Sequence, residues 1–258
     1  MARHGGALTD SARYWDAAAY NELADHQEGW GRSVLERLEL SGDEVVLDAG
    51  CGSGRVTKLI AERLPRGRVI GVDASKEMIE FARGRLGNRV ELHCSDLLEL
   101  ELDAPVDVIF SNATFHWIDQ QQLLYDKLAS LLHPDGVLEA QCGAIGNIAE
   151  LERVVDAASD AVPFAPYLRG MERTWNFVGS SDTQARLQAA GFSEHRTWLD
   201  SAQVKPREPH RYLRTVFLRA HVAALPEELE DRFIEEVLGG MPRPFALETV
   251  RLNVSARR

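Results

Sequence analysis

The chain has 258 residues, of which 45% are hydrophobic and 27% charged, so it can bury a complete α/β core and has the composition of a soluble globular protein. Its 29 basic and 40 acidic residues give a net charge of −11, which argues against a nucleic-acid partner whose phosphates would need neutralising. The sequence has no membrane-length apolar run, no signal-peptide core and no closely spaced cysteines, so we expect a cytoplasmic protein without a disulfide framework or a metal site.

Strand and helix patterns alternate through the first 142 residues, as in a parallel sheet whose strands are joined by crossover helices. An amphipathic helix with Val34, Leu35 and Leu38 on its apolar face comes first. The segment 133–136, which reads H-P-D-G, is predicted to be a turn before the fifth strand. The five strands are predicted at residues 44–49, 68–73, 90–93, 106–110 and 137–141.

Beyond the fifth strand the pattern is less regular. Capping patterns at Asn147 and Ser181 predict two helices. The chain is then predicted to form a strand, two helices and a last strand, at residues 193–200, 209–223, 226–238 and 249–255. In the last strand apolar and polar residues alternate as in a half-buried strand: Val250, Leu252 and Val254 against Arg251, Asn253 and Ser255.

The turn after the first strand carries the strongest functional signal. Three glycines alternate in the segment 48–54, which reads D-A-G-C-G-S-G, and a second acid, Asp73, lies nineteen residues after Gly54. Glycines let a nucleoside-containing ligand lie against the backbone, and a carboxylate at the next strand tip can accept hydrogen bonds from both ribose hydroxyls. The spacing G-x-G-x-G differs from the G-x-G-x-x-G of dinucleotide-binding turns, so it favours a different adenosyl cofactor.

This turn resembles motif I of the class I S-adenosylmethionine-dependent methyltransferases, and the order of strands along the whole chain resembles their sheet. The likeness is greatest to the trans-aconitate methyltransferase-like branch. It rests on the leader with Tyr14-Trp15-Asp16 and residues 27–31, on residues 111–117 after the fourth strand, and on a helical insertion before the last strand.

The resemblance implies an α/β fold with a Rossmann-like, doubly wound, seven-stranded and mostly parallel sheet, helical insertions, and an antiparallel last strand between the fifth and sixth. Residues 1–258 would form a single methyltransferase domain. Its parts would be a helical leader or lid at 1–40, a cofactor-binding core at 41–142, and a substrate-covering part at 143–258.

The resemblance also implies S-adenosylmethionine as the cofactor and assigns its contacts. The motif I turn would hold the methionine half, and Asp73 would hold the ribose. A helix-capping role for Asp96 stays open beside a cofactor contact. The residues expected to bind the cofactor are Asp48, Gly50, Cys51, Gly52, Gly54, Asp73, Ala74, Ser95, Asp96, Leu97, Asn112 and Ala113.

Candidate substrate contacts lie in the leader, after the fourth strand and in the insertion. His116 would be a substrate contact or a general base, although a packing role for it and Trp117 stays open. The other candidates for the substrate are Tyr14, Gln27, Trp30, Trp117 and Trp175. The insertion further offers Arg169, Arg173, Arg211 and Arg214 as carboxylate clamps, with Tyr167, Trp175 and Tyr212 as apolar walls.

We expect a methyltransferase that acts on a small molecule, first of all by carboxyl O-methylation, because a carboxylate is already ionised at neutral pH and needs no base. Methylation at nitrogen or carbon stays open and would give His116 the role of a base. A nicotinamide-dependent oxidoreductase and a non-catalytic cofactor-binding regulator are the remaining alternatives. We expect no nucleic-acid or membrane partner and a monomer, with an oligomer left open. The excess of arginine over lysine is typical of a bacterial source.

Overall fold

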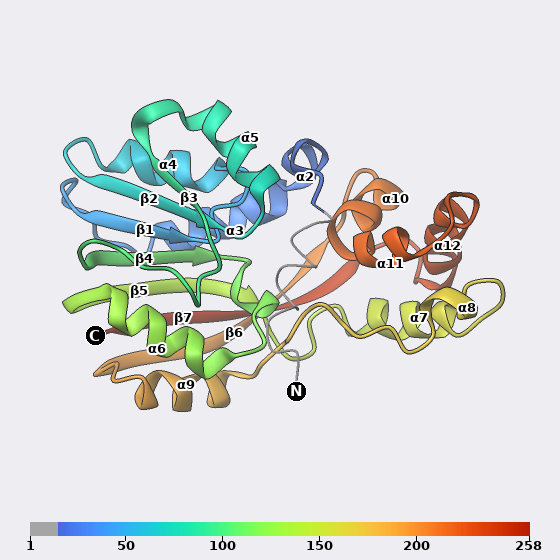
Figure 1. Cartoon of the computed structure of the whole chain (residues 1–258). Coiled ribbons are helices and arrows are strands. Elements are labelled where there is room, and N and C mark those ends of the chain that lie inside the picture. Colours follow the sequence, from blue (N-terminus) through green and yellow to red (C-terminus); the bar gives the residue numbers. More distant parts are fainter. Residues whose placement is uncertain (1–14) are drawn as a thin grey trace, which may run out of the picture.

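Seven strands form one sheet in the computed structural model, which describes residues 15–258 (Figure 1). Across the sheet the order is β3-β2-β1-β4-β5-β7-β6. β7 pairs antiparallel with β5 and β6, and the other neighbours pair in parallel. The predicted doubly wound α/β sheet with its inserted antiparallel strand is confirmed. The strands are β1 (Val45–Ala49), β2 (Arg68–Asp73), β3 (Glu91–Cys94), β4 (Val106–Asn112), β5 (Leu132–Gly143), β6 (Glu194–Val204) and β7 (Leu247–Arg257).

Helices cover both faces of the sheet. Successive residues of a strand point to opposite faces, and in the buried strands the residues on both faces are apolar, so both faces need to be covered. Leu47 of β1 points into a core shared with α6 (Gln121–Leu131) and α9 (Ser180–Ala189). Its neighbour Val46 points into the opposite core. That second core contains residues of α3 (Asp25–Leu35), α4 (Arg55–Arg63) and α5 (Lys76–Leu86).

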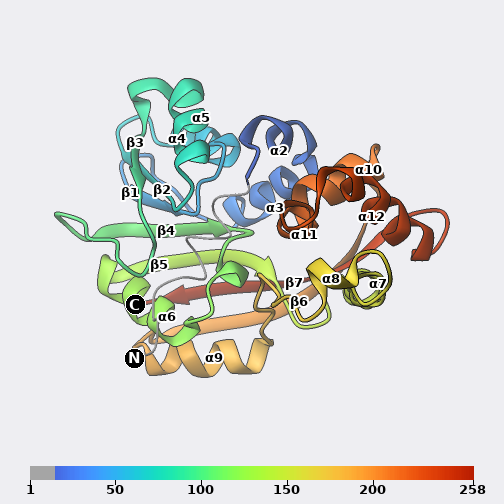
Figure 2. The same ribbon diagram turned by 45° about the vertical axis from the view of Figure 1, so that its right-hand side comes forward.

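A further group of helices gathers beyond the carboxyl ends of the parallel strands (Figure 2). It packs around its own apolar core, which includes Phe164, Tyr212 and Phe233. None of the helices between residues 15 and 258 combines the length and the apolar character that crossing a membrane requires. The group consists of α7 (Ala149–Ser159), α8 (Ala165–Leu168), α10 (Pro209–Tyr212), a π-helix (Leu213–Phe217), α11 (Arg219–Ala224) and α12 (Glu227–Gly240), and α2 (Ala17–Leu23) lies beside it.

The predicted bounds differ from the structure at several elements: β6 and β7, predicted at 193–200 and 249–255, extend over Glu194–Val204 and Leu247–Arg257. The turn predicted at 133–136 lies inside β5, where the register with β4 shifts and Asp135 has a φ of 65°. The helix predicted at 209–223 is interrupted by the π-helix. Neither predicted cap forms. Ile148 occupies the cap position of α7, and the Asn147 side chain accepts the Val250 amide instead. Ser181 lies inside α9, whose cap position is occupied by Gly179.

Candidate functional site

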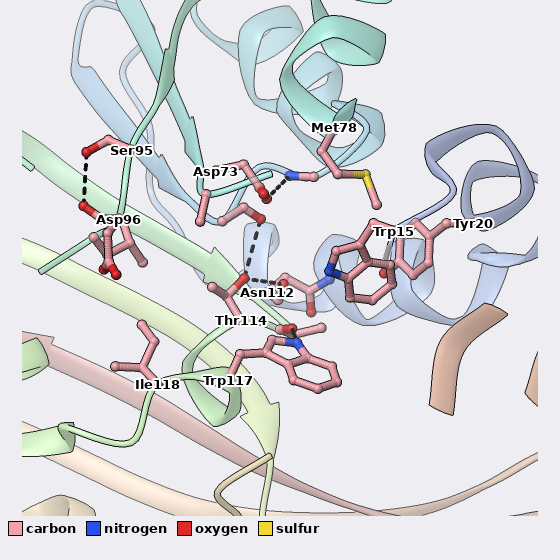
Figure 3. A pocket seen from close by; sticks show the side chains of 15 residues that line it. Trp15, Tyr20, Asp73, Met78, Ser95, Asp96, Asn112, Thr114, Trp117 and Ile118 are labelled. Atoms are coloured by element: carbon pink, nitrogen blue, oxygen red, sulfur yellow. Dashed lines mark hydrogen bonds between the residues drawn. The ribbon is translucent and has the colours of Figure 1, made fainter. Parts of the chain in front are cut away.

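The turns after β1, β2, β3 and β4 meet in a pocket at the carboxyl edge of the sheet, which we call the strand-end pocket. Figure 3 shows Trp15, Tyr20 and Trp117 together at one side of it and Ser95 and Asp96 at the other. Its empty space, including the part that is open to solvent, is about 730 Å³. The predicted cofactor residues that line it are Gly50, Gly52, Asp73, Ala74, Ser95, Asp96, Leu97, Asn112 and Ala113.

The glycine-rich turn has a backbone that residues with a side chain rarely adopt. The φ angles of Gly50, Gly52 and Gly54 are 89°, 53° and 78°, all in the left-handed region. A side chain at Gly50 would in addition overlap Thr114. The Gly50 amide donates to the carbonyl of Val72, which ties the turn to β2. Gly54 is the N-cap of α4 and does not line the pocket, so its role is to turn the chain into the helix.

Asp73 lies in the wall of the strand-end pocket with both carboxylate oxygens already oriented. They accept the amide of Gly52 at 2.9 Å and the amide of Ser75 at 2.8 Å. Burial raises the pKa of the Asp73 carboxyl, and these two amide donors counteract the shift. Each oxygen keeps a lone pair, so Asp73 can still accept hydrogen bonds from a ligand's hydroxyl groups.

Asp48 lies deeper, beneath the turn. Its Oδ2 accepts the hydroxyl of Thr57 at 2.7 Å, and burial raises the pKa of the Asp48 carboxyl to about 7. Asp48 and Cys51 line a smaller cavity that adjoins the strand-end pocket and shares Gly50, Gly52 and Asn112 with it. An elongated ligand could therefore pass over the turn from one cavity into the other.

A second cavity, the aromatic pocket, shares Trp15, Tyr20, Ala113 and Trp117 with the strand-end pocket. Leader, core and insertion all contribute to its wall. Tyr14 lies outside the residues that the structure describes. The other predicted substrate residues, Gln27, Trp30, His116, Trp117 and Trp175, all line this pocket, as do Phe177, Tyr212 and Phe217.

His116 lies in the single 3-10 turn Phe115–Trp117 and lines the aromatic pocket. Its Nδ1 accepts the backbone amide of Gly143 at 3.3 Å. Burial and the positive charges of Arg251 and Arg219 hold the imidazole pKa well below its ordinary value of 6.5. The ring is therefore neutral, and because Nδ1 accepts, the single proton is assigned to Nε2. This arrangement favours a hydrogen-bond donor over a general base.

Arg251 of β7 contributes a buried positive charge to the aromatic pocket. Its Cζ lies 4.2 Å from the centre of the Trp30 ring, and its Nε donates to Gln141 Oε1 at 3.4 Å. Burial lowers the guanidinium pKa to about 10, so the charge persists at neutral pH. Within residues 15–258 its Nη2 has no hydrogen-bond partner, and no carboxylate comes within ion-pairing distance of it.

Arg219, the first residue of α11, is a second buried cation. Its Cζ lies 3.8 Å from the centre of the Trp15 ring and 4.4 Å from that of Trp117, two side chains that line both pockets. Its Nη1 donates to the Val216 carbonyl in the π-helix, and burial lowers its pKa to about 9. In the described part of the chain it too has no acidic partner.

Comparisons with known proteins identify the family. Residues 46–136 match a family described as a methyltransferase domain. Over 189 residues the chain is 32% identical to a trans-aconitate 2-methyltransferase of Methylobacterium nodulans, which covers 73% of this chain and 68% of that protein. The chain belongs to the class I S-adenosylmethionine-dependent methyltransferases. Within that family it lies in the trans-aconitate methyltransferase branch.

Two further relatives match this methyltransferase over a shorter stretch. A trans-aconitate 2-methyltransferase of an Azoarcus strain is 41% identical over 127 residues, which cover 49% of this chain and 50% of the relative. A malonyl-[acyl-carrier protein] O-methyltransferase of Acetivibrio thermocellus is 37% identical over 126 residues, 48% of this chain and 44% of the relative. The chain thus matches about half the length of these two relatives.

Solved structures agree on the fold. The YcgJ protein of Bacillus subtilis superposes with a TM-score of 0.61 at 17% identity, over 90% of this chain and 98% of that one. At that identity the likeness concerns the arrangement of helices and strands alone. It is a Rossmann-like arrangement, as predicted.

This methyltransferase is an enzyme with S-adenosylmethionine as its cofactor, so a nicotinamide-dependent oxidoreductase and a non-catalytic regulator are not supported. The strand-end pocket fits the cofactor on its own geometry. The glycine turn leaves the backbone open to a ligand, Asp73 has lone pairs free for hydroxyls, and Met78 and Leu97 provide apolar surface. In residues 15–258 no three His, Cys, Asp or Glu side chains gather as they would around a metal ion.

The arginines expected to clamp a carboxylate lie elsewhere on this methyltransferase, and that expectation is wrong. None of them lines either pocket, because each is paired with acids on the surface of the insertion. Tyr167, expected as an apolar wall, is 50% exposed. The surface pairs are Arg169 with Asp160, Arg173 with Glu152 and Asp156, Arg211 with Glu22 and Glu208, and Arg214 with Glu230 and Asp231.

No motif marks Arg251, which lines the aromatic pocket, or Arg219, which packs on the lining residues Trp15 and Trp117. In β7 the expected half-buried pattern is wrong, since Arg251 and Asn253 are 5% and 0% exposed. The only signal in the sequence is a charged residue between apolar neighbours in the last strand. That signal is not sufficient, because the sequence does not tell which face of a strand is covered. Other lining residues without an expected role include Trp15, Tyr20, Met78, Thr114, Ile118 and Phe177.

Proposed function

We propose that this methyltransferase forms a methyl ester on a small organic acid that Arg251 holds in the aromatic pocket. The buried charge of Arg251, unpaired within the described chain, is the observation that carries the proposal. A cation without hydration or an anionic partner is costly in a protein interior. Because Arg251 lines the aromatic pocket, an acid bound there would supply that anion. The names of relatives that act on trans-aconitate and on a malonyl group support an acidic acceptor.

The chemistry asks little of the protein beyond positioning. When bound, S-adenosylmethionine supplies a methyl group on a positively charged sulfur. A carboxylate oxygen is already an anion at neutral pH, so the site has no proton to remove. Its tasks are to orient the acid and to exclude water, and positioning of this kind can contribute roughly 7–11 kcal/mol. The aromatic wall excludes water, Arg251 holds the anion, and the Nε2 proton of His116 gives a second donor.

The acceptor class is tested with S-adenosylmethionine that carries a labelled methyl group. The purified enzyme is incubated with a panel of small mono-, di- and tricarboxylic acids, phenols and amines, and the products are treated with mild base. We expect label on acids alone, released by base as methanol, as a methyl ester requires. Base-stable label on an amine, a phenol or a carbon atom would overturn the proposal in favour of the corresponding methyltransferase.

The role of Arg251 is tested with Arg251→Met, which keeps the aliphatic stem and removes the charge. We expect KM for the acid to rise by about tenfold to a hundredfold, because a charge-assisted hydrogen bond contributes roughly 1.5–3 kcal/mol. The matched control is Arg196→Met at an exposed position of the edge strand β6, which should leave KM unchanged. S-adenosylhomocysteine affinity should be normal in both variants. An unchanged KM in Arg251→Met would remove the basis of the proposal.

A further inference from the structure

A row of buried polar side chains crosses the sheet on the face that packs against α3. Glu139 and Gln141 of β5 and Arg251 and Asn253 of β7 are all at most 5% exposed. Gln141 is paired with Asn253, and residues opposite each other in an antiparallel pair lie on the same face. Buried positions are usually apolar, so four neighbouring polar side chains require a physical reason.

Two charged groups fix the direction of the hydrogen bonds in this row. Arg37 can only donate: its Nε donates to Glu139 Oε2 at 2.7 Å and its Nη1 to Asn253 Oδ1 at 3.1 Å. Asp200 can only accept, and its Oδ2 receives Asn253 Nδ2 at 2.8 Å. Asn253 therefore has one orientation that satisfies both neighbours, with its carbonyl toward Arg37 and its amide nitrogen toward Asp200.

Asn253 in turn orients Gln141. Gln141 Nε2 donates to the same Asn253 Oδ1 at 3.0 Å, so the Gln141 carbonyl oxygen faces Nε of Arg251. Asp200 lies opposite Arg251 in the register of β6 and β7, but its carboxylate is engaged by Asn253 and by the Trp198 indole nitrogen. The group that contacts the Arg251 guanidinium in this row is thus a neutral carbonyl.

We infer that Gln141 positions Arg251 for its substrate while leaving the positive charge of Arg251 unneutralised. A carboxylate at the same place would orient Arg251 equally well but would compete with an incoming acid. A purely apolar residue would leave the charge free but the guanidinium unoriented. This inference rests on the proposed function, in which Arg251 holds the acid, and it adds a positioning residue that touches neither substrate nor cofactor.

The variants Gln141→Glu and Gln141→Met separate charge from packing, because both replacements nearly preserve the size of the side chain. We expect Gln141→Glu to raise KM for the acid about tenfold or more, with a smaller change in kcat, since an anion then occupies Arg251. Gln141→Met should raise KM by only a few fold. Gln188→Glu, an exposed position on α9, makes the same charge change and should alter neither constant. An equal rise in KM in Gln141→Glu and Gln141→Met would indicate that residue 141 acts through packing alone, and it would overturn the inference.

A substrate-free readout separates failure of this inference from failure of the proposed function. The thermal unfolding midpoint is measured for Gln141→Glu alone and in the Arg251→Met background. We expect Gln141→Glu to lower the midpoint more in the Arg251→Met background, where its carboxylate has no cation. If the two substitutions lower the midpoint additively, residue 141 does not contact Arg251, and the inference would fall. If the changes in midpoint are not additive but the enzyme methylates no acid, the proposed function would be overturned while the contact between residue 141 and Arg251 would stand.

Discussion

His116 has its protonation state fixed by its surroundings. The amide of Gly143 donates to Nδ1, so Nε2 carries the proton of the neutral ring. Burial, followed by the charges of Arg251 and Arg219, moves the imidazole pKa well below 6.5. The ring therefore stays neutral from mildly acidic to alkaline pH. A group that does not titrate in this range and has its accepting nitrogen occupied is suited to donate a hydrogen bond to an acid, and unsuited to remove a proton.

We expect the ratio of kcat/KM between wild type and His116→Gln to be independent of pH between about 6 and 8, because the neutral form of His116 persists throughout. His116→Gln keeps an N–H donor and should stay within a few fold of wild type, whereas His116→Ala should lose about tenfold. Initial rates over the pH range measure this, and S-adenosylhomocysteine binding checks that the variants fold. A rise in rate near pH 6.5 that is absent in His116→Gln would identify the histidine as a base.

At the scale of elements, the sequence predicts those features whose cause is local. The glycine turn and Asp73 are found where expected because a left-handed backbone and a strand-end carboxylate depend on a few adjacent residues. The segment 209–223 reads as one helix, yet a π-helix interrupts it where Val216 and Phe217 pack against other parts of the chain. Such packing is set by residues far apart in sequence, and periodicity alone does not contain it.

One side chain of the core, Arg55, contacts both leader helices, α2 and α3. Arg55, the first residue of α4, donates to the Asn21 carbonyl, to Glu28 Oε2 at 2.7 Å and to Asp25 Oδ1 at 2.9 Å. Arg55 follows directly on the glycine turn, so this contact joins the cover of the strand-end pocket to its floor. Tyr20 of α2 lines that pocket.

We expect Arg55→Met to release this contact and to let bound S-adenosylhomocysteine dissociate several fold faster, because opening of a cover commonly limits product release. Stopped-flow measurement of dissociation tests this. The control is Arg32→Met: Arg32 lies within α3 and pairs with the same Glu28, and among residues 15–258 it makes no hydrogen bond or ion pair with the core. Equal dissociation rates in wild type and Arg55→Met would mean that the leader does not control release.

At the scale of the whole molecule, the site is assembled from three separated parts of the chain. The strand-end pocket is built mostly from strand ends in residues 41–142, and for that reason its residues follow from motifs. The aromatic pocket needs Trp15 from the leader and Phe217 from the insertion, and its charge comes from Arg251 in the last strand. Only the folded chain brings these together, which explains why the arginines chosen from the sequence of the insertion do not line the pocket.

The buried acid Asp48 affects the stability of the entire fold. Its pKa in the folded protein, about 7, lies above its ordinary value of 3.8. Between these two pH values the Asp48 carboxyl is protonated in the folded state and ionised in the unfolded state. The contribution of this proton to the free energy of unfolding is therefore fully present below about pH 4. It falls by on the order of 1 kcal/mol per pH unit up to about pH 7 and is constant above that. We expect Asp48→Asn to lack this slope, so its stability relative to wild type rises between pH 5 and pH 8. Denaturant unfolding at both pH values measures it, with the exposed Asp103→Asn as control. A difference that does not vary with pH would mean that Asp48 ionises below pH 5 in the folded enzyme.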